Sequence, residues 1–418
     1  MSSFVFNRRT STLKHPPGPT DNWPTGMMSH FREDSLGTMW RLNRKYGDAV
    51  RFRFFLHYHA YLFSHPDHVQ HILQSNNRNY TKLPSPANIL LKPLVGLGLL
   101  TSDGDFWLRQ RRLAQPAFHR RRIASFATTM TDAAGEMLER WQGPAAAGQA
   151  LNVVEEMTRL TLEIAGKTLF SVDLTREADT VGDAFTEAST ELMEFLDRPF
   201  GPYLVNLSWW PGGRPLRRHL AVLDEVVEAI IEERRRERQA GRGASDDLLD
   251  MLMDARDEET GEGMSNKQLR DEVMTLMLAG HETTSLALSW TVYLLSQHPE
   301  QRRRLEQEVD EVLGGRQPAM EDMQHLTYTK MVLEESMRLY PPAYALSRWC
   351  VEADEVGGYY LPAESAVTLS PYLTHRHPDF WVDPERFNPE RFRAEHQAER
   401  PRFAYMPFGG GPRQCIGN

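Results

Sequence analysis

The sequence predicts a mainly α-helical fold with a minor β region. Helical periodicity, with apolar residues three and four positions apart, dominates from about residue 106 to residue 338. Short segments rich in aromatic and β-branched residues lie outside that stretch, near the N-terminus and again around residues 358–361 and 366–370. Neither a tandem repeat nor a linker divides the chain, so we expect a single domain over residues 1–418.

The N-terminal part is expected to be extended and then to form a hairpin. Three prolines between His15 and Pro19 exclude a helix, and residues 1–20 are therefore predicted to be a stiff extended lead. Residues 49–55 and 60–63 are strand-like and flank a short polar segment. We expect these two segments to pair as a β-hairpin.

One predicted helix is much longer than the others. Ser265 and Gln268 form a capping box, and the apolar pattern then runs from Leu269 to Gln297 before His298 and Pro299 stop it. At 1.5 Å per residue such a helix is about 45 Å long, enough to cross a whole domain. We expect it to be the central helix of the fold.

Composition and charge restrict the class of protein. The net charge of −9 argues against nucleic acid as a partner. Cys350 and Cys415 are the only cysteines and form no Cys-x-x-Cys, which argues against a disulfide framework and a structural zinc site. The apolar run at residues 4–6 is too short for a signal peptide or a spanning helix of about 20 residues. We expect a cytoplasmic protein without a membrane span.

The middle of the predicted long helix departs from ordinary helix chemistry. Gly280 costs about 1 kcal/mol relative to alanine, and the hydroxyl residues that follow it compete for backbone carbonyls. Such departures often mark functional sites. Ala279 and Gly280 would open a groove for a small ligand, with Glu282 and Thr283 beside it. The alternative is a glycine tolerated for close helix packing, with Glu282 solvated.

The last residues of the chain place one thiol in a glycine-rich loop. Residues 408–417 read FGGGPRQCIG. Glycines let the backbone wrap close to a sulfur atom, an apolar residue such as Phe408 excludes water, and Arg413 offers a fixed positive charge to a porphyrin propionate. A glycine-rich turn with an inert buried cysteine is the alternative. The complete spacing favours a haem-thiolate pocket in which Cys415 is the iron ligand.

The two unusual segments fit one chemistry. Dioxygen at a thiolate-bound iron must receive protons before its O–O bond breaks, and the proton source must stay near a water-poor pocket. A threonine hydroxyl backed by a carboxylate that exchanges with solvent suits that relay. Thr283 and Glu282 are therefore the predicted proton-delivery pair.

Basic residues elsewhere are candidates for binding the propionates. Trp107 and Arg111 are one helical turn apart and both suit a carboxylate, although the segment also fits an amphipathic surface helix. Arg348 and His375 are further candidates, each equally readable as a surface charge. A nearby basic run could dock an acidic electron donor or be a solvated face; it consists of Arg109, Arg112, Arg120, Arg121 and Arg122.

A Glu-Arg-Arg network is the third expectation from charged residues. Glu335 and Arg338 lie at i and i+3 on a helix that Pro341 and Pro342 end. Two Pro-Glu-Arg-Phe segments follow, and Arg391 in the second of them could complete the network.

Taken together, these motifs make the sequence resemble a cytochrome P-450, a haem-thiolate monooxygenase, over essentially its whole length. Cys415 matches the proximal ligand of that family, residues 107–111 its propionate-binding helix, and residues 279–284 the oxygen-activating part of its long distal helix. Glu335, Arg338 and Arg391 match residues with a structural role. The resemblance implies haem b, O₂, and propionate pairing by Trp107, Arg111, Arg348 and Arg413.

The resemblance also implies partners and a substrate class. Arg413 and the Pro-Glu-Arg-Phe segment resemble the branch with fatty-acid hydroxylases and microsomal members, here as a soluble bacterial protein. Electrons would come from NAD(P)H through a separate reductase and a ferredoxin- or flavodoxin-type donor. Pocket walls are expected at residues 89–91, around Ala279 and at residues 343–346. Their aliphatic character implies an apolar substrate, whether lipid, terpenoid or polyketide-like.

Two other functions and one departure from the family stay open. A haem-thiolate isomerase or peroxygenase would use the same ligand without the acid and the alcohol, and a haem sensor or carrier would need no open distal groove. Family members continue past the cysteine into a helix under the haem, whereas this chain stops at Asn418. We therefore expect a truncated sequence or an incomplete proximal side.

Overall fold

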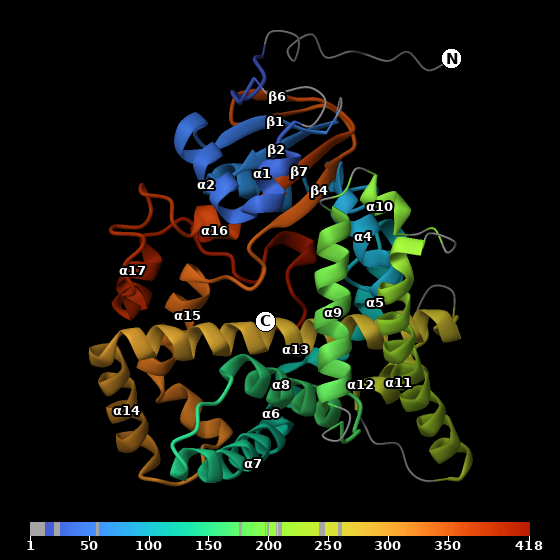
Figure 1. Ribbon diagram of the computed structural model, residues 1–418, viewed down its shortest axis with the longest axis vertical. Helices are drawn as coiled ribbons and strands as arrows, with labels where there is room; N and C mark the ends of the chain where they lie inside the picture. Colours follow the sequence, from blue (N-terminus) through green and yellow to red (C-terminus); the bar gives the residue numbers. More distant parts are fainter. Residues whose placement is uncertain are drawn as a thin grey trace.

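The structure is a computed structural model that describes residues 13–20, 26–55, 58–174, 178–196, 198, 200–205, 207, 211–241, 247–257 and 261–418. A large helical body carries a small β region at one end, and helix α13 (Asn266–Gln297) crosses the middle of the molecule (Figure 1). The predicted mainly α fold with a minor β region is confirmed.

The β region is a five-stranded sheet in the order β1-β2-β7-β4-β3. Strands β1 (Ala49–Phe55) and β2 (Tyr58–Phe63) pair antiparallel, so the predicted hairpin is confirmed. Strand β7 (Ser365–Leu369) runs parallel to β2 and antiparallel to β4 (Leu346–Cys350). The remaining strands are β3 (Tyr80–Thr81), β5 (Asp354–Val356) and β6 (Tyr359–Leu361).

Both faces of this sheet are covered, because side chains alternate between them along each strand. Val50, Phe52 and Leu62 pack with α2 (Ser35–Tyr46), whereas Tyr61 and Phe63 pack with α3 (Pro66–Gln70) and the segment around Phe403. The described part of the N-terminal lead has no regular secondary structure. It lies along the β region, since the Arg51 amide donates to the Pro17 carbonyl oxygen at 2.9 Å. Residues 1–12 of the predicted lead lie outside the described residues.

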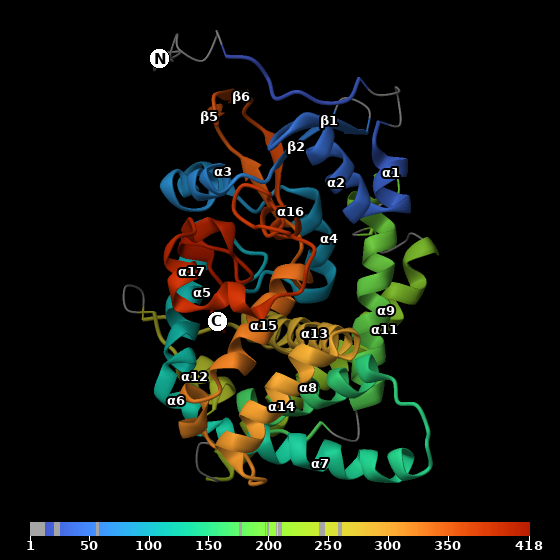
Figure 2. The same cartoon turned by 90° about the vertical axis from the view of Figure 1, so that its left-hand side faces the viewer.

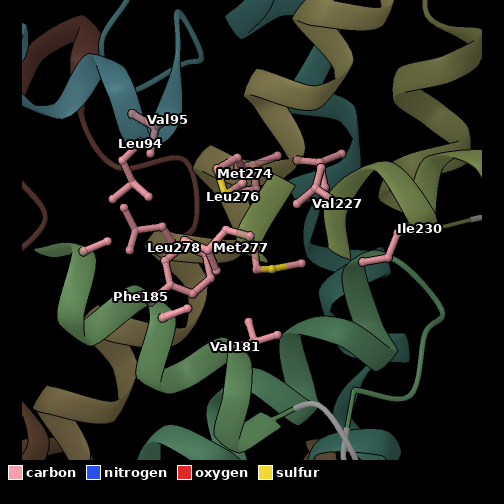
Figure 3. Close-up of a cluster of buried hydrophobic side chains, with 14 of the residues drawn as sticks. Leu94, Val95, Val181, Phe185, Val227, Ile230, Met274, Leu276, Met277 and Leu278 are labelled. Carbon is pink, nitrogen blue, oxygen red and sulfur yellow. The ribbon is translucent and has the colours of Figure 1, made fainter. Parts of the chain in front are cut away.

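Helix α13 begins and ends where its sequence predicts. Both hydrogen bonds of the capping box between Ser265 and Gln268 are present, and His298 is the C-cap residue before Pro299 begins α14 (Pro299–Leu313). The buried residues in the first half of α13 join an apolar cluster with α4 (Pro86–Val95), α9 (Ala178–Leu196) and α11 (Arg214–Gln239) (Figure 3). Its most extensive contact is with α8 (Val153–Leu169).

The other helices complete the body on both sides of α13 (Figure 2). They are α1 (Met28–Glu33), α5 (Gly104–Ala114), α6 (Arg120–Ser125), α7 (Ala127–Ala146), α10 (Gly201–Leu204), α12 (Leu248–Asp254), α15 (Thr327–Leu339), α16 (Pro371–Thr374) and α17 (Ala394–Ala398). Among the residues that the structure describes, none of these helices combines the length and apolar character needed to cross a bilayer.

Candidate active site

The loop that carries Cys415 is shaped by its glycines. Gly409 and Gly411 have φ values of +70° and +69°, which favour glycine. A Cβ at Gly411 would lie 1.7 Å from the carbonyl oxygen of Leu73, so only glycine fits there. The Cys415 amide donates to the carbonyl oxygen of Phe408 at 3.0 Å, which closes the loop.

The two cysteines lie in opposite environments. Cys415 is exposed, whereas Cys350 is buried in the sheet, where burial raises the pKa of its thiol to about 12. The alternative interpretation, an inert buried cysteine, therefore fits Cys350 and does not fit Cys415. In both views the end of the chain that carries Cys415 lies beside α13 (Figures 1 and 2).

Arg413 lies at the centre of a group of cations next to this loop. Its guanidinium stacks on the Trp107 ring, with 4.3 Å between its Cζ and the ring centroid. It donates to the Ser102 carbonyl oxygen at 2.7 Å and to the carboxylate of Asp103. The other terminal nitrogen, Nη1, is buried without a hydrogen-bond partner.

Two more cations share this environment. Arg348, on β4, is 6% exposed, and burial followed by the charge of Arg413 lowers the pKa of its guanidinium to about 10. Burial and the charges of both arginines hold the pKa of Lys82 well below its usual range. Asp103 is the one carboxylate that acts on all three cations, and its second oxygen is already bonded to the Lys82 and Leu83 amides at 2.6 and 2.7 Å.

This cation group, formed by Lys82, Arg348 and Arg413, fits the two propionates of a haem. One carboxylate faces these cationic side chains, and the desolvated guanidinium of Arg348 costs free energy unless an anion compensates its charge. The buried Nη1 of Arg413 also needs an acceptor. The residues present therefore suit haem, whose two propionates would bind to the cation group and whose iron would be ligated by the exposed thiol of Cys415.

The structure separates the predicted propionate candidates. Trp107 and Arg348 join Arg413, as described above. Arg111 instead donates to the carbonyl oxygen of Gln414 at 3.0 Å, so it braces the backbone next to Cys415. His375 is a correction. It is fully buried, its Nε2 accepts from the Met406 amide at 2.9 Å, and burial with two neighbouring arginines lowers its pKa to about 3. A neutral imidazole in that place offers a propionate no charge.

The predicted Glu-Arg-Arg network is formed beneath the same loop. Arg338 and Glu335 are both 0% exposed and joined by two hydrogen bonds of 2.6 and 2.9 Å. Arg391 completes the network, with its Nε 3.4 Å from Oε1 of Glu335. Buried charges of this kind persist only when they are paired.

Part of the basic run is paired within the protein. Arg109 and Arg112 both reach the buried carboxylate of Asp257, at 3.6 and 3.2 Å. Arg109 also donates to the carbonyl oxygens of Glu262 and Gly263. These two arginines therefore anchor α5 to the segment before α13.

The four predicted residues on α13 lie on different faces. Ala279 and Thr283 are exposed, and the Thr283 hydroxyl donates to the Ala279 carbonyl oxygen at 2.7 Å. Glu282 is half-buried, and burial raises the pKa of its carboxyl group. A Cβ at Gly280 would meet Ala165 and Leu169 of α8 at 3.8 Å, so this glycine points toward the neighbouring helix. The close-packing interpretation therefore fits Gly280, and the ligand groove remains a prediction for Ala279 and Thr283.

Lys82 of the cation group and its carboxylate partner Asp103 had no signal in the sequence. Lys82 is an isolated lysine between a two-residue strand and a proline. Asp103 precedes a helix, where an aspartate normally caps the first turn, yet its side chain makes no capping hydrogen bond. Its partners Lys82 and Arg413 are far away in the sequence, and only the fold brings the three together.

Comparison with known proteins identifies the family to which the chain is similar. The family model described as Cytochrome P450 matches residues 16–418, which include both the cysteine loop and α13. Cyclooctatin synthase of Streptomyces melanosporofaciens is 38% identical over 370 residues, covering 86% of this chain and 76% of that protein. Cyclooctat-9-en-7-ol 5-monooxygenase of the same organism is 35% identical over 360 residues, with the same two coverages. The chloroplastic protein LUTEIN DEFICIENT 5 of Arabidopsis thaliana is 32% identical over 439 residues, covering 99% of this chain and 71% of that protein.

Proposed function

We propose, since this chain belongs to the cytochrome P450 family, that its exposed Cys415 is the proximal ligand of a site that oxidises a hydrophobic organic substrate. Members of the family bind haem b, and the chain is a haem-thiolate monooxygenase. It thus inserts one oxygen atom from O₂ into its substrate. The observation that carries the assignment of residues is the pairing of an exposed thiol with an incompletely compensated cation group.

The cofactor is held from two sides in this proposal. Cys415 supplies the sulfur ligand, and Lys82, Arg348 and Arg413 bind the propionates. Trp107 keeps the guanidinium of Arg413 in place by stacking on it. When bound, the haem supplies the redox and oxygen chemistry that no side chain of the protein can provide.

Thr283 and Glu282 move protons on the other side of the site. The raised pKa of Glu282 lets its carboxyl group carry a proton closer to neutral pH, and its half-buried position lets it exchange that proton with solvent. The Thr283 hydroxyl is exposed and can pass a proton on after turning away from the Ala279 carbonyl oxygen.

The substrate in our proposal is a mainly hydrocarbon molecule. One relative is named for oxidising position 5 of cyclooctat-9-en-7-ol, an unsaturated alcohol. The aliphatic residues 89–91, which we expect to form part of the pocket wall, support the same class here. A strongly hydrogen-bonding substrate would leave its polar groups unpaired against such a wall.

Electrons come from NAD(P)H through a reductase and a ferredoxin- or flavodoxin-type donor in this proposal. We also propose that the chain acts as one domain, since β4 brings Arg348 from the β region into the same group as Arg413.

Product formation tests the reaction against its rivals. Purified protein is incubated with an apolar substrate and either a reductase, a ferredoxin and NADH, or hydrogen peroxide alone. Product that requires the electron donors supports the proposal. Product formed with peroxide alone would identify a peroxygenase. Product formed without electron donors and without peroxide would identify an isomerase. A haem-loaded protein that forms no product under any of these conditions would be a sensor or carrier.

A Thr283→Ala variant tests the proton pathway. We expect it to consume NADH while releasing mostly peroxide, because the proton donor is missing. A variant that keeps the product yield per NADH of the unaltered protein would remove Thr283 from this role.

A further inference from the structure

The segment of α13 that carries Glu282 and Thr283 is in contact with α8 through the side chain of Thr161, which the sequence did not indicate. Thr161, on α8, is 4% exposed, and its hydroxyl lies 3.0 Å from the carbonyl oxygen of His281. His281 immediately precedes Glu282 and lies two residues before Thr283. Among the hydroxyl contacts of residues 279–285 that the structure describes, this one joins α13 to another helix.

The carbonyl group that Thr161 contacts belongs to the peptide bond that leads into Glu282. The carbonyl of His281 and the amide nitrogen of Glu282 belong to one rigid peptide plane. A donor fixed on α8 therefore restricts the rotation of the plane from which the Glu282 backbone starts. The other contacts in this stretch, from Thr283 to Ala279 and from Ser285 to Glu282, stay within α13 and move with it.

The packing around His281 strengthens this attachment. Its ring is buried against Phe185 of α9, with 4.8 Å between ring centroids, and its Nδ1 lies 2.9 Å from the Met277 carbonyl oxygen. Gly280 faces α8, because a Cβ placed on it would lie 3.8 Å from Ala165, one turn after Thr161. Both sides of the segment between Gly280 and Glu282 are thus held, while Thr283 on the exposed face stays accessible.

The hydroxyl of Thr161 has one proton and three acceptors within reach. The carbonyl oxygens of Met157, His281 and Thr158 lie at 2.9, 3.0 and 3.2 Å. Two of these belong to the preceding turn of α8 itself. The contact with His281 matters only if the proton is shared across the helix interface, and a matched variant can decide this.

We propose that Thr161 is a positioning residue that holds the His281–Glu282 peptide of α13 in the orientation needed for proton delivery through Glu282 and Thr283. The proposal rests on the monooxygenase function proposed above. Thr161 acts through the backbone of another helix and need not touch the substrate or the cofactor.

Three substitutions test it. Thr161→Val keeps the shape of the side chain and removes the donor, and Thr161→Ser restores the hydroxyl. Thr168→Val is the matched control, because Thr168 lies on the same helix, is 5% exposed and donates to the Ile164 carbonyl oxygen of its own helix at 2.6 Å. Circular dichroism and thermal unfolding verify that all three variants are folded.

The first measurement is amide hydrogen exchange over residues 279–285, in haem-free and haem-loaded protein, and it needs no activity. We expect Thr161→Val to speed this exchange by roughly threefold to tenfold, the ratio expected for one buried hydrogen bond. The serine variant should restore the rate, and Thr168→Val should leave it unchanged. Equal rates in the two valine variants would overturn the proposal.

The second measurement is the partition of NADH electrons between product and peroxide. We expect Thr161→Val to lower the product yield per NADH by a similar factor, with recovery in Thr161→Ser. If exchange is faster but the partition equals that of Thr168→Val, Thr161 holds the helix without serving proton delivery, and the proposal is wrong. Failure of the proposed function would show separately, as absence of product from the unaltered protein, and the exchange result would still decide whether Thr161 holds α13.

Discussion

The two groups of buried charge beside the cysteine loop differ in how completely they are paired. In the pair of Glu335 and Arg338, all five N–H donors of Arg338 have acceptors, supplied by Glu335 and by three backbone carbonyls, while Arg391 joins the pair through an ion pair in which its buried Nε makes no hydrogen bond. In the cation group, Arg413 keeps a buried nitrogen without a partner, and Arg348 has one hydrogen-bond acceptor in the described chain, its neighbour's carbonyl oxygen.

This difference distinguishes a charged group that stabilises the fold from one that binds the cofactor. A saturated buried pair such as Glu335 and Arg338 contributes to the stability of the protein before any ligand arrives, and removing one member leaves the other unpaired. An unsaturated group destabilises the protein alone and gains its partners from the ligand. Glu335 and Arg338 should therefore affect folding, and Arg348 and Arg413 should affect retention of the haem.

The largest effect is expected from Glu335→Ala. The substitution leaves Arg338 and Arg391 buried near each other without a carboxylate, which typically costs about 3–5 kcal/mol. Urea unfolding of the haem-free protein, followed by circular dichroism, measures the loss. Adding Arg338→Met should recover part of it. An unchanged unfolding midpoint in the single variant would contradict the structural role of the network.

Arg348→Met should affect haem binding and leave the stability of the haem-free protein intact, in contrast to Glu335→Ala. The haem-free protein should be as stable as the unaltered protein or slightly more so, because a desolvated charge without a carboxylate of its own is removed. Affinity for haem should fall by about tenfold to a hundredfold, the scale of one hydrogen bond to a charged group. Haem titration and urea unfolding check the two parts. If Arg348→Met lost as much stability as Glu335→Ala, the cation group would stabilise the fold as the network does, and the difference between the two groups would be contradicted.

The pH dependence of stability at Glu272 tests whether an incompletely paired buried charge destabilises the protein. This carboxyl is 0% exposed on α13, its Oε2 accepts from the Leu99 amide at 3.0 Å, and its Oε1 has no partner. Burial raises its pKa to about 7, above the ordinary value of 4.5. Because the raised pKa favours the protonated acid in the folded state, the stability it contributes is present below pH 4.5 and is lost as pH rises through about 7.

A Glu272→Gln variant should therefore gain stability relative to the unaltered protein as pH rises from 5 to 8. The gain is at most about 3 kcal/mol, because each tenfold change in an acid dissociation constant corresponds to about 1.4 kcal/mol. Unfolding free energies at several pH values measure it. Parallel curves for the two proteins over this range would show that Glu272 ionises without a penalty.

The smallest effect is expected at the surface. Arg302 and Glu306 form an i,i+4 pair at 2.7 Å with side chains 60% and 49% exposed. Arg302→Gln should change the free energy of unfolding by less than about 0.5 kcal/mol, because solvent screens such pairs. A larger loss in urea unfolding would mean that pairing alone, without burial, determines the effect.

Local chemistry explains what the sequence could predict. The capping box at Ser265 and the stop at His298 act within a few residues, so both ends of α13 were predictable. The β1–β2 hairpin and the pair of Glu335 and Arg338 are also local in sequence. The loop geometry around Cys415, with its positive-φ glycines, is likewise local, whereas the role of Cys415 as iron ligand stays a prediction.

Non-local pairing explains what the sequence could not predict. Asp103 was missed because its position indicates a helix cap, whereas its carboxylate binds Arg413 near the other end of the chain. His375 was a candidate for the propionates, or for a surface charge, because imidazole can carry a charge in water, although the fold buries it and lowers its pKa to about 3. The sequence left Gly280 between a ligand groove and close helix packing, and the structure directs it toward α8, where a Cβ would lie 3.8 Å from Ala165 and Leu169. In each case the deciding contact comes from an element far away in the sequence.

The bond between the Cys415 sulfur and the haem iron is the claim on which the rest depends. Its most direct test is the absorption spectrum of the purified, haem-loaded protein after reduction and addition of carbon monoxide. We predict the red-shifted band of a thiolate-bound carbonyl complex, and its loss in Cys415→Ala. A folded, haem-loaded protein whose carbonyl complex lacks that band, or a Cys415→Ala variant that keeps it, would contradict the account.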